Sequence, residues 1–174
     1  NKDVDIISQI GGYNALVELN SEIKNPVMVF SCDGVGTKLK LANTLEEFQN
    51  IGIDLVAMVA NDIICSGAIP KVFLEYIAHL DLTIDQLKAI IIGIQQGCEL
   101  AGMSLVGGET AQLPGLYATK KYDLAAFGMG LIEKENIIHP GLVKPGDTIL
   151  GLTSSGIHSN GYSLINQILT DKNI

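Results

Sequence analysis

The sequence predicts an α+β fold in which a mixed β-sheet carries helices on one face, in the order β-α-β-α-β-β. Hydrophobic residues make up 47% of the 174-residue chain and charged residues 17%, a balance that suits a packed core and argues against disorder. Runs rich in β-branched residues alternate with segments whose apolar residues recur at helical spacing. The length fits one domain, or one domain and part of another.

The first predicted strand covers residues 26–32, which are β-branched and aromatic and which we expect to be buried. A helix is predicted over residues 51–67, because their apolar side chains recur every three or four positions. A second strand follows over residues 70–80. The second helix begins at a capping box, in which Thr83 precedes Gln86 by three positions.

Gly102 is expected to end this helix, since glycine commonly terminates helices. A short strand over residues 103–106 then ends at the paired glycines Gly107 and Gly108. The last strand of this part covers residues 122–133. Its alanines and glycines predict close packing of its backbone against a neighbour.

A linker rich in proline and glycine spans residues 138–147. A new strand over residues 148–153 and a helix from about residue 161 are predicted after it. No further segment follows to pair with this strand. We therefore expect residues 1–140 to form one domain and residues 141–174 to begin a second, incomplete domain.

The charge balance restricts the class of partner. The chain has 11 Lys and Arg against 19 Asp and Glu, a formal net charge of -8, whereas a nucleic-acid partner would need a basic surface. Cys32, Cys65 and Cys98 lie far apart in apolar contexts and are expected to be reduced core thiols, which indicates a cytoplasmic protein. No apolar run approaches the roughly 18 residues that a membrane span needs.

The most informative segment is Asp-Gly-Val-Gly-Thr-Lys, from Asp33 to Lys38, directly after the first strand. Gly34 and Gly36 allow the backbone to approach a ligand closely, and Thr37 supplies a hydroxyl group. A carboxylate at one end and an ammonium group at the other suit a phosphate chain with a bound metal. The segment is not a Walker A loop, which needs Gly-Lys-Ser/Thr at the start of a helix.

Two more acidic positions indicate the same chemistry. Asn61 and Asp62 interrupt an apolar helix, where an unpaired carboxylate would be unfavourable. A bound cation would satisfy Asp62, although a cap or a salt bridge within the fold would do so equally. Glu109 and Thr110 follow paired glycines at a strand end, and a solvated loop is the alternative for Glu109. With Asp33, these carboxylates would supply ligands for one or two Mg²⁺ ions.

The Ser- and Gly-rich segment 154–163 follows a predicted strand and opens a helix. Free N–H groups at a helix start bind anions, and His158 would act as an acid or a base near neutral pH. A loop histidine among N-capping serines is the alternative interpretation.

Together these motifs resemble the phosphoribosylformylglycinamidine cyclo-ligase (aminoimidazole ribonucleotide synthetase) family over essentially the whole chain. The resemblance rests on residues 33–38, 52–58, 61–62, 107–115 and 155–163. It implies ATP-dependent closure of the imidazole ring of aminoimidazole ribonucleotide from formylglycinamidine ribonucleotide in purine biosynthesis. Other members of the superfamily, of the selenophosphate synthetase or thiamine-monophosphate kinase type, are an alternative, and so is an inactive, dimerising nucleotide-binding module.

The resemblance also implies roles for individual residues. Mg²⁺ would be held by Asp33, Asp62 and Glu109. The nucleotide would contact Asp33, Gly34, Gly36, Thr37, Lys38, Asn61, Gly107, Gly108 and Thr110. The substrate would contact Ser155, Gly156, His158, Ser159 and Asn160, and catalysis would fall to His158 and Lys38. The resemblance further implies a homodimer whose N-terminal sheets close a β-barrel, and a chain without a leading segment and most of a C-terminal domain.

Overall fold

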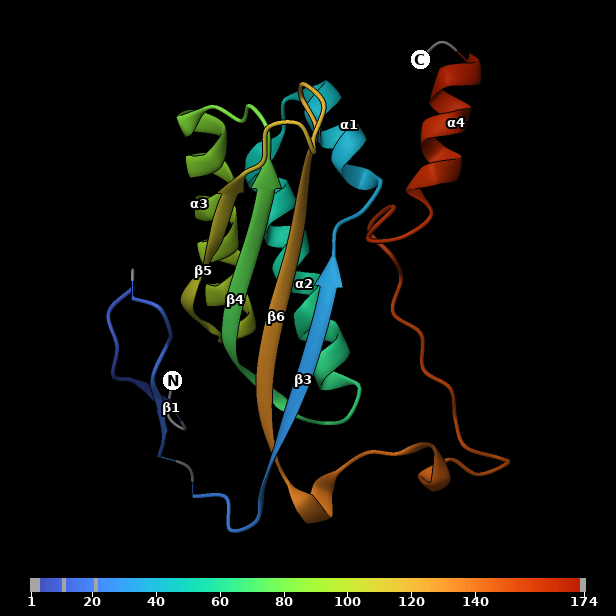
Figure 1. The fold of residues 1–174 in the computed structure, drawn as a ribbon. Coiled ribbons are helices and arrows are strands. Elements are labelled where there is room, and N and C mark those ends of the chain that lie inside the picture. Colours follow the sequence, from blue (N-terminus) through green and yellow to red (C-terminus); the bar gives the residue numbers. More distant parts are fainter. Residues whose placement is uncertain (1–3, 11, 21, 173–174) are drawn as a thin grey trace.

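The computed structural model describes residues 4–10, 12–20 and 22–172, and Figure 1 shows their arrangement. The strands are β1 (Val4–Ile6), β2 (Val17–Leu19), β3 (Pro26–Gly34), β4 (Ile69–His79), β5 (Ser104–Gln112) and β6 (Tyr122–Glu133). The helices are α1 (Lys38–Leu45), α2 (Phe48–Ile64), α3 (Ile84–Ala101) and α4 (Tyr162–Lys172), with 3₁₀ turns η1 (Lys134–Asn136) and η2 (Pro140–Leu142).

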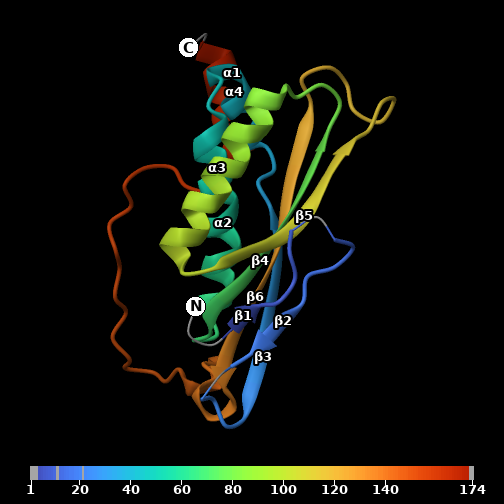
Figure 2. The same cartoon turned by 90° about the vertical axis from the view of Figure 1, so that its left-hand side faces the viewer.

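One four-stranded mixed sheet forms the centre of the fold, in the strand order β3-β6-β4-β5. β4 and β5 run parallel, whereas β6 is antiparallel to both β3 and β4. Figure 2 shows α2 and α3 on one face of this sheet. The mixed sheet and the helices on one face agree with the α+β prediction. In the described chain β3 and β5 do not pair with each other, so the sheet is open and not a closed barrel.

The core lies between the sheet and α2. Leu55, Val59 and Ile63 of α2 are fully buried, because residues four apart share one side of a helix. Gly128 of β6 faces this side, and a Cβ there would lie 2.4 Å from Val59 Cγ1. The close packing predicted for residues 122–133 is therefore confirmed, and the neighbour that β6 meets at Gly128 is α2.

Both predicted ends of α3 are confirmed. The Gln86 N–H donates to Thr83 Oγ1 over 3.3 Å, and the Thr83 N–H donates to Gln86 Oε1 over 2.9 Å, which is a complete capping box. Gly102 follows the helix with a φ of +67°, a left-handed conformation that favours glycine. Local signals therefore place this helix without help from the tertiary structure.

The prediction of a buried first strand is wrong, because β3 is an outer strand covered by helices on one side only. Its residues alternate between half-buried and exposed, and Met28 and Phe30 are 53% and 71% exposed on the open face. Cys32 lies on this open face and Cys65 near the end of α2 is also exposed, so only Cys98 is the core thiol that the sequence predicts.

Two predicted segments differ in extent or type. β5 does not end at the paired glycines but continues to Gln112, because its parallel pairing with β4 continues through Gly107 and Gly108. Residues 148–153 form no strand and are exposed, since no described strand lies beside them to pair with. The helix predicted from about residue 161 is α4, which lies beside α1 after the chain has arched away from the sheet (Figure 1).

The sequence reasoning did not predict α1 or the small antiparallel pair of β1 and β2. Within the described residues, no helix is long and apolar enough to cross a membrane.

Candidate functional site

The segment 33–38 joins the end of β3 to the start of α1. Asp33 and Gly34 are the last residues of β3, and Lys38 is the first residue of α1. Gly36 between them has a φ of +68°, which residues with a Cβ rarely adopt. The Gly34 N–H donates to Asp33 Oδ1 over 2.7 Å. The glycines therefore allow the sharp turn that presents this segment's polar groups beyond the strand.

The Lys38 ammonium group joins this segment to the second half of the predicted site. It forms an ion pair with Asp54 of α2, and its Nζ donates to the His158 carbonyl over 3.0 Å. It also lies 5.2 Å from the ring centroid of Tyr162, within cation–π range. The side chain is only 16% exposed, so these contacts are partly shielded from water. Two motifs far apart in the sequence thus meet at one cation.

Thr37 adds a second connection between the same two segments. Its Oγ1 lies 3.4 Å from Ser163 Oγ, and its carbonyl accepts a hydrogen bond of 3.1 Å from Asn166 Nδ2. The first turns of α4 are therefore held against the start of α1.

The predicted substrate residues lie together in the loop before α4. His158 Nε2 is 3.0 Å from Ser155 Oγ, and this contact orients the exposed imidazole ring. Gly156, Ser159 and Asn160 belong to the same loop. Of these five residues, His158 contacts Lys38 among the described residues, through its backbone carbonyl.

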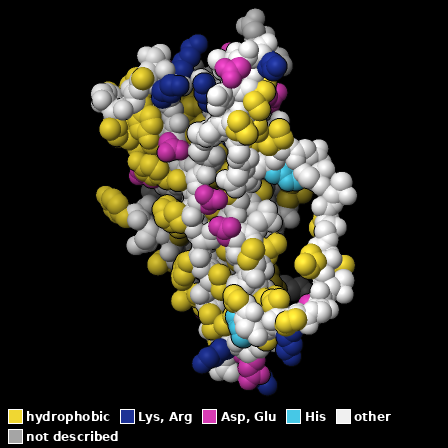
Figure 3. Space-filling view, turned by 90° about the vertical axis from the view of Figure 1, so that its right-hand side faces the viewer, with side chains coloured by type: hydrophobic (Ala, Val, Ile, Leu, Met, Phe, Trp, Pro, Cys, Tyr) yellow, Lys and Arg dark blue, Asp and Glu magenta, His cyan; other side chains and the backbone are white. Residues whose placement is uncertain are grey.

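The carboxylate of Asp62 lies beside β3. Ser31 Oγ donates to Asp62 Oδ2 over 2.9 Å, and Asp33 is two residues beyond Ser31 on the same side of the strand. Asn61 and Asp62 are exposed, so the expected burial of this pair is wrong: this part of α2 lies over an outer strand, where solvent reaches it. Figure 3 shows acidic side chains along the middle of this face, below the lysines at its upper end.

Asn61 does not join the other predicted residues at segment 33–38. Its side chain lines an apolar hollow of about 300 Å³ between α2 and α3, together with Ile53 and Gly97. Consecutive side chains on a helix point about 100° apart around its axis. Asn61 therefore lies on the α3 side of α2, whereas Asp62 lies on the β3 side.

The second predicted nucleotide segment, residues 107–110, lies at the opposite edge of the sheet from β3. Glu109 pairs with Tyr76 of β4. Tyr76 in turn pairs with Ala125 of β6, and Ala125 pairs with Gly34 of β3. Three strand spacings, about 14 Å in all, therefore separate Glu109 from Gly34. The exposed Glu109 also lies on the open face, whereas Asp33 lies on the face that α2 covers.

A single copy of the chain therefore brings Asp33 and Asp62 to one side of β3, without Glu109. Among residues 4–10, 12–20 and 22–172, no group of three or more His, Cys, Asp or Glu is placed to hold one metal ion. The order of the strands in the sheet separates Glu109 from Asp33 and Asp62, and this order cannot be read from a single sequence.

Sequence reasoning missed Glu75, which lines a hollow of about 720 Å³ with Gly107, Gly108 and Glu109. Burial raises the pKa of Glu75 from 4.5 to about 7, against a smaller lowering by a backbone hydrogen bond. Its Oε2 has no hydrogen-bond partner in the part of the chain that the structure describes. A Cβ on Gly108 would lie 2.1 Å from Glu75 Cδ, so the glycine makes room for this carboxyl group. The sequence signal that could have identified this residue is a single glutamate within the apolar run of residues 72–77.

The family described as AIR synthase related protein, N-terminal domain, matches residues 12–132. The chain belongs to this family. The AIR synthase related chain is 50% identical to the phosphoribosylformylglycinamidine cyclo-ligase of Neisseria meningitidis serogroup C strain FAM18, over 97% of this chain and 49% of that protein. It is 55% identical to the protein of the same name from Coxiella burnetii strain RSA 331, over 94% and 47% of the two chains. It spans about half the length of the curated relatives it matches.

Solved structures share the fold of this AIR synthase related chain. A thiamine-monophosphate kinase from Stenotrophomonas maltophilia K279a matches with a TM-score of 0.63 and 21% identity, over 77% of this chain and 39% of the kinase. The hydrogenase maturation protein HypE in complex with ATP matches with a TM-score of 0.58 and 20% identity, over 78% and 38% of the two chains. At these identities the likeness establishes the fold and not the activity.

Proposed function

We propose that this chain contributes the N-terminal, ATP-binding part of a phosphoribosylformylglycinamidine cyclo-ligase, which closes the imidazole ring of aminoimidazole ribonucleotide. The observation that carries the proposal is 50–55% identity to proteins of that name across 94–97% of the chain. Residues 1–140 would form the ATP-binding, dimerising domain, and residues 141–174 would begin a second domain. A purine-biosynthetic enzyme of this kind would work in the cytoplasm.

The reaction needs positioned groups and charge neutralisation more than a strong nucleophile. The amide oxygen of formylglycinamidine ribonucleotide is a poor leaving group. ATP, when bound, supplies a phosphoryl group to this oxygen, and the amidine nitrogen then displaces phosphate within the same molecule. The products are aminoimidazole ribonucleotide, ADP and phosphate. The chain's contribution would be to hold the reacting groups in place and to offset the charge on the phosphoryl oxygens.

Lys38 is suited to the transferred phosphoryl group. Its Nζ donates to the neutral carbonyl of His158, and an anionic phosphoryl oxygen is a stronger acceptor than a carbonyl. The ion pair with Asp54 keeps the ammonium group in position during this exchange. The contact between His158 Nε2 and Ser155 Oγ holds the imidazole ring, which leaves Nδ1 available to hold or move a proton of the substrate.

Asp33 and Asp62 fit Mg²⁺, because Ser31, which donates to the Asp62 carboxylate, lies on the same side of β3 as Asp33. Mg²⁺ commonly takes one or two protein carboxylates and completes its shell with phosphate oxygens and water. Glu109 would hold a second ion at the other edge of the sheet, beside the hollow of about 720 Å³. This volume is within the range of small-molecule sites. Because the hollow and Lys38 lie at opposite edges of the sheet in one copy, Gly107 and Gly108 would contact the nucleotide across the dimer.

We also propose a homodimer that pairs two open sheet faces. Met28 and Phe30 of β3 and Phe127 of β6 are 53%, 71% and 50% exposed on this helix-free face. Large apolar side chains gathered on one surface commonly mark an interface. Two such sheets packed face to face would cover these side chains and close the barrel that the family resemblance implies. Native mass spectrometry of the full-length protein would detect the dimer, and a monomer would contradict this part of the proposal.

A coupled assay tests the activity by ADP release from formylglycinamidine ribonucleotide and ATP, with the full-length protein. Lys38→Met should lower kcat at least 100-fold, whereas Lys134→Met at the other end of the molecule should leave it unchanged. Absence of ADP release with this substrate would refute the proposal. Phosphate transfer to thiamine phosphate or to selenide would instead support one of the alternative enzymes.

Titration of Mg-ATP into this chain alone separates a binding module from an inert fold. Wild type should bind, and Asp62→Asn should bind more weakly. Equal affinity of the two proteins would contradict the role of Asp62.

A further inference from the structure

We propose that a hollow between α1 and the β5–β6 connection binds the phosphate group of a phosphorylated small molecule. The hollow measures about 480 Å³, and three lysines, Lys40, Lys120 and Lys121, line it. This volume lies within the range of small-molecule sites. Lys40 comes from α1 and the other two lysines come from the connection, so tertiary folding brings the three cations together.

The concentration of positive charge is unusual for this chain. The chain has 11 basic and 19 acidic residues, yet the lining of this hollow includes three lysines and a single carboxylate, Asp123. Asp123 Oδ1 already accepts a hydrogen bond of 2.9 Å from the Leu124 N–H. The lining therefore carries an excess of two positive charges, and an anion with two negative charges would neutralise it.

The three lysines lack ion-pair partners among the described residues. In that part of the chain, ion pairs join Lys38 to Asp54 and Lys88 to Asp85, and no ion pair involves a lysine of the hollow. Like charges that face one hollow repel each other. A bound anion would remove this repulsion, so the empty hollow favours anion binding on electrostatic grounds.

The backbone of Lys120 is fixed at this position. Its N–H donates to Asp81 Oδ1 over 2.8 Å, and its carbonyl accepts a hydrogen bond of 3.2 Å from Asn43 Nδ2. Its φ is +58°, in the left-handed region where glycine is the usual residue. Such outliers persist where the surroundings hold them, and they gather at ligand sites. A lysine at this position presents an ammonium group from a backbone that cannot easily move.

A phosphate monoester matches the lining better than a carboxylate does. It carries up to two negative charges and three strong acceptor oxygens near pH 7, which correspond to the charge excess and to three ammonium donors. Thr44 lines the same hollow, and its hydroxyl donates to the Lys40 carbonyl over 3.0 Å, which holds the backbone of that lysine. Lysine rather than arginine suits this role, because an ammonium group binds phosphate as a point charge without demanding a planar geometry.

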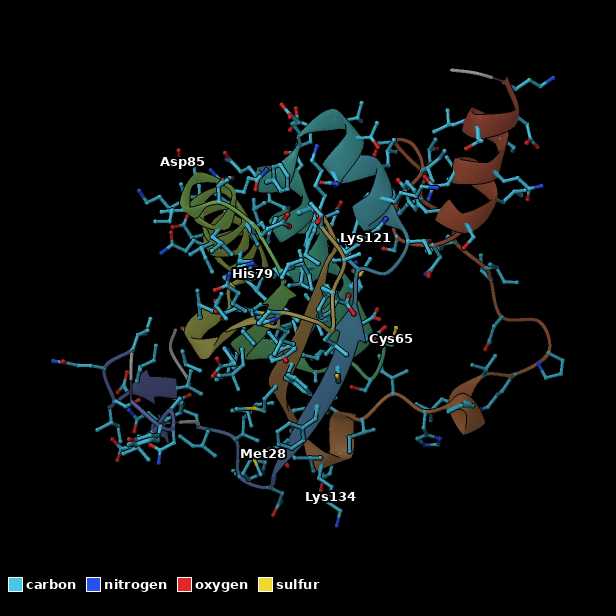
Figure 4. The ribbon with its side chains drawn as sticks, turned by 45° about the horizontal axis from the view of Figure 1, so that its top comes forward. Met28, Cys65, His79, Asp85, Lys121 and Lys134 are labelled. Atoms are coloured by element: carbon cyan, nitrogen blue, oxygen red, sulfur yellow. The ribbon has the colours of Figure 1, made fainter. Side chains whose placement is uncertain are left out.

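The site is separate from the groups that the cyclo-ligase proposal uses, apart from Gly36 and Thr37. Figure 4 shows Lys121 close to α1, and Lys134 well away from it at the bottom of the view. Lys134 is exposed and does not line the hollow, so it is a matched control for the loss of one lysine charge.

Isothermal titration calorimetry of the full-length protein tests the proposal without ATP, Mg²⁺ or turnover. The probes are ribose 5-phosphate, inorganic phosphate and ribose, at constant ionic strength. Wild type should bind ribose 5-phosphate, and the double variant Lys40→Ala/Lys121→Ala should weaken this binding at least tenfold, since each hydrogen bond to a charged group contributes strongly. Lys134→Ala should stay within twofold of wild type.

Lys120→Gly provides a second test that avoids backbone strain. Glycine accepts the left-handed φ, so this variant should fold and should still lose affinity, while its melting temperature reports on folding. Equal binding of inorganic phosphate and ribose 5-phosphate would support the site with free phosphate as its ligand. Equal binding of ribose and ribose 5-phosphate, no binding by wild type, or unchanged affinity in all lysine variants would overturn it. If the wild-type protein binds ribose 5-phosphate but has no cyclo-ligase activity, the proposed function is refuted and the anion site is not.

Discussion

Replacing Glu75 with glutamine should stabilise the protein more at alkaline pH than at acid pH. Burial raises the pKa of this carboxyl group from 4.5 to about 7, and one of its oxygens has no hydrogen-bond partner within the described chain. The pKa is higher in the folded state than in the unfolded state. The contribution of the Glu75 carboxyl group to folding stability is therefore fully present below about pH 4.5, and it is lost as the pH rises to about 7. Above that pH the folded protein holds an ionised carboxylate that is only partly solvated.

The size of the effect follows from the same two values. The rise in the pKa of Glu75 from 4.5 to about 7 corresponds to an upper limit of about 3.4 kcal/mol in folding stability, at 1.36 kcal/mol for each pKa unit. Because the carboxyl group is not fully buried, solvent screening reduces this to about 1–2 kcal/mol. Glutamine has nearly the shape of the protonated acid and no charge. The stability gained by Glu75→Gln should therefore be about 1 kcal/mol larger at pH 8 than at pH 5.5.

Urea denaturation followed by circular dichroism, at pH 5.5, 7 and 8, measures these gains. Glu99→Gln is the matched control, because Glu99 is an exposed glutamate of α3. Its substitution should change the free energy of unfolding little at any of the three pH values. A gain from Glu75→Gln that does not grow with pH, or an equal trend in the control, would refute the assigned environment of Glu75.

Three further predictions concern stability, all measured by urea denaturation. Lys38→Met and Asp54→Asn should show a coupling energy of about 1–2 kcal/mol in a double-mutant cycle, and additive effects would contradict their ion pair. Gly52→Ala should cost about 2 kcal/mol or more, because its Cβ would lie 2.3 Å from a carbonyl oxygen of α3, whereas Gly151→Ala meets nothing within 4 Å and should be neutral. Thr83→Ala should cost about 1 kcal/mol through loss of the cap, and an unchanged midpoint would argue against that cap.

The parts of the fold that sequence reasoning predicted well are those that local chemistry determines. α2, β4 and β6 lie close to their predicted ranges, because apolar periodicity reports which side of an element is covered. The two ends of α3 depend on Thr83, Gln86 and Gly102, whose effects act within a few residues. α1 was missed because it is only eight residues long, which is too short for helical periodicity to stand out in the sequence.

The parts that were not predicted depend on contacts between distant segments. Composition made β3 look buried, but helices cover only one face of the sheet, which leaves every second side chain of β3 in solvent. Glu109 resembled a partner of Asp33 by motif, whereas the strand order puts the two at opposite edges. Lys38 contacts the carbonyl of His158, and their shared role in catalysis stays a prediction that the family resemblance supplied.

The pairing of β3 has a consequence for how the chain folds during synthesis. In the four-stranded sheet, β3 pairs only with β6, and the register joins Pro26 to Glu133. A ribosome releases β3 early and β6 much later, so the backbone N–H and C=O groups of β3 stay without their strand partner while α2, β4, α3 and β5 assemble. Pairs so distant in sequence form slowly, and unpaired strand edges favour aggregation meanwhile. Interruption of translation before Tyr122 would leave β3 and β4 without the strand that joins them.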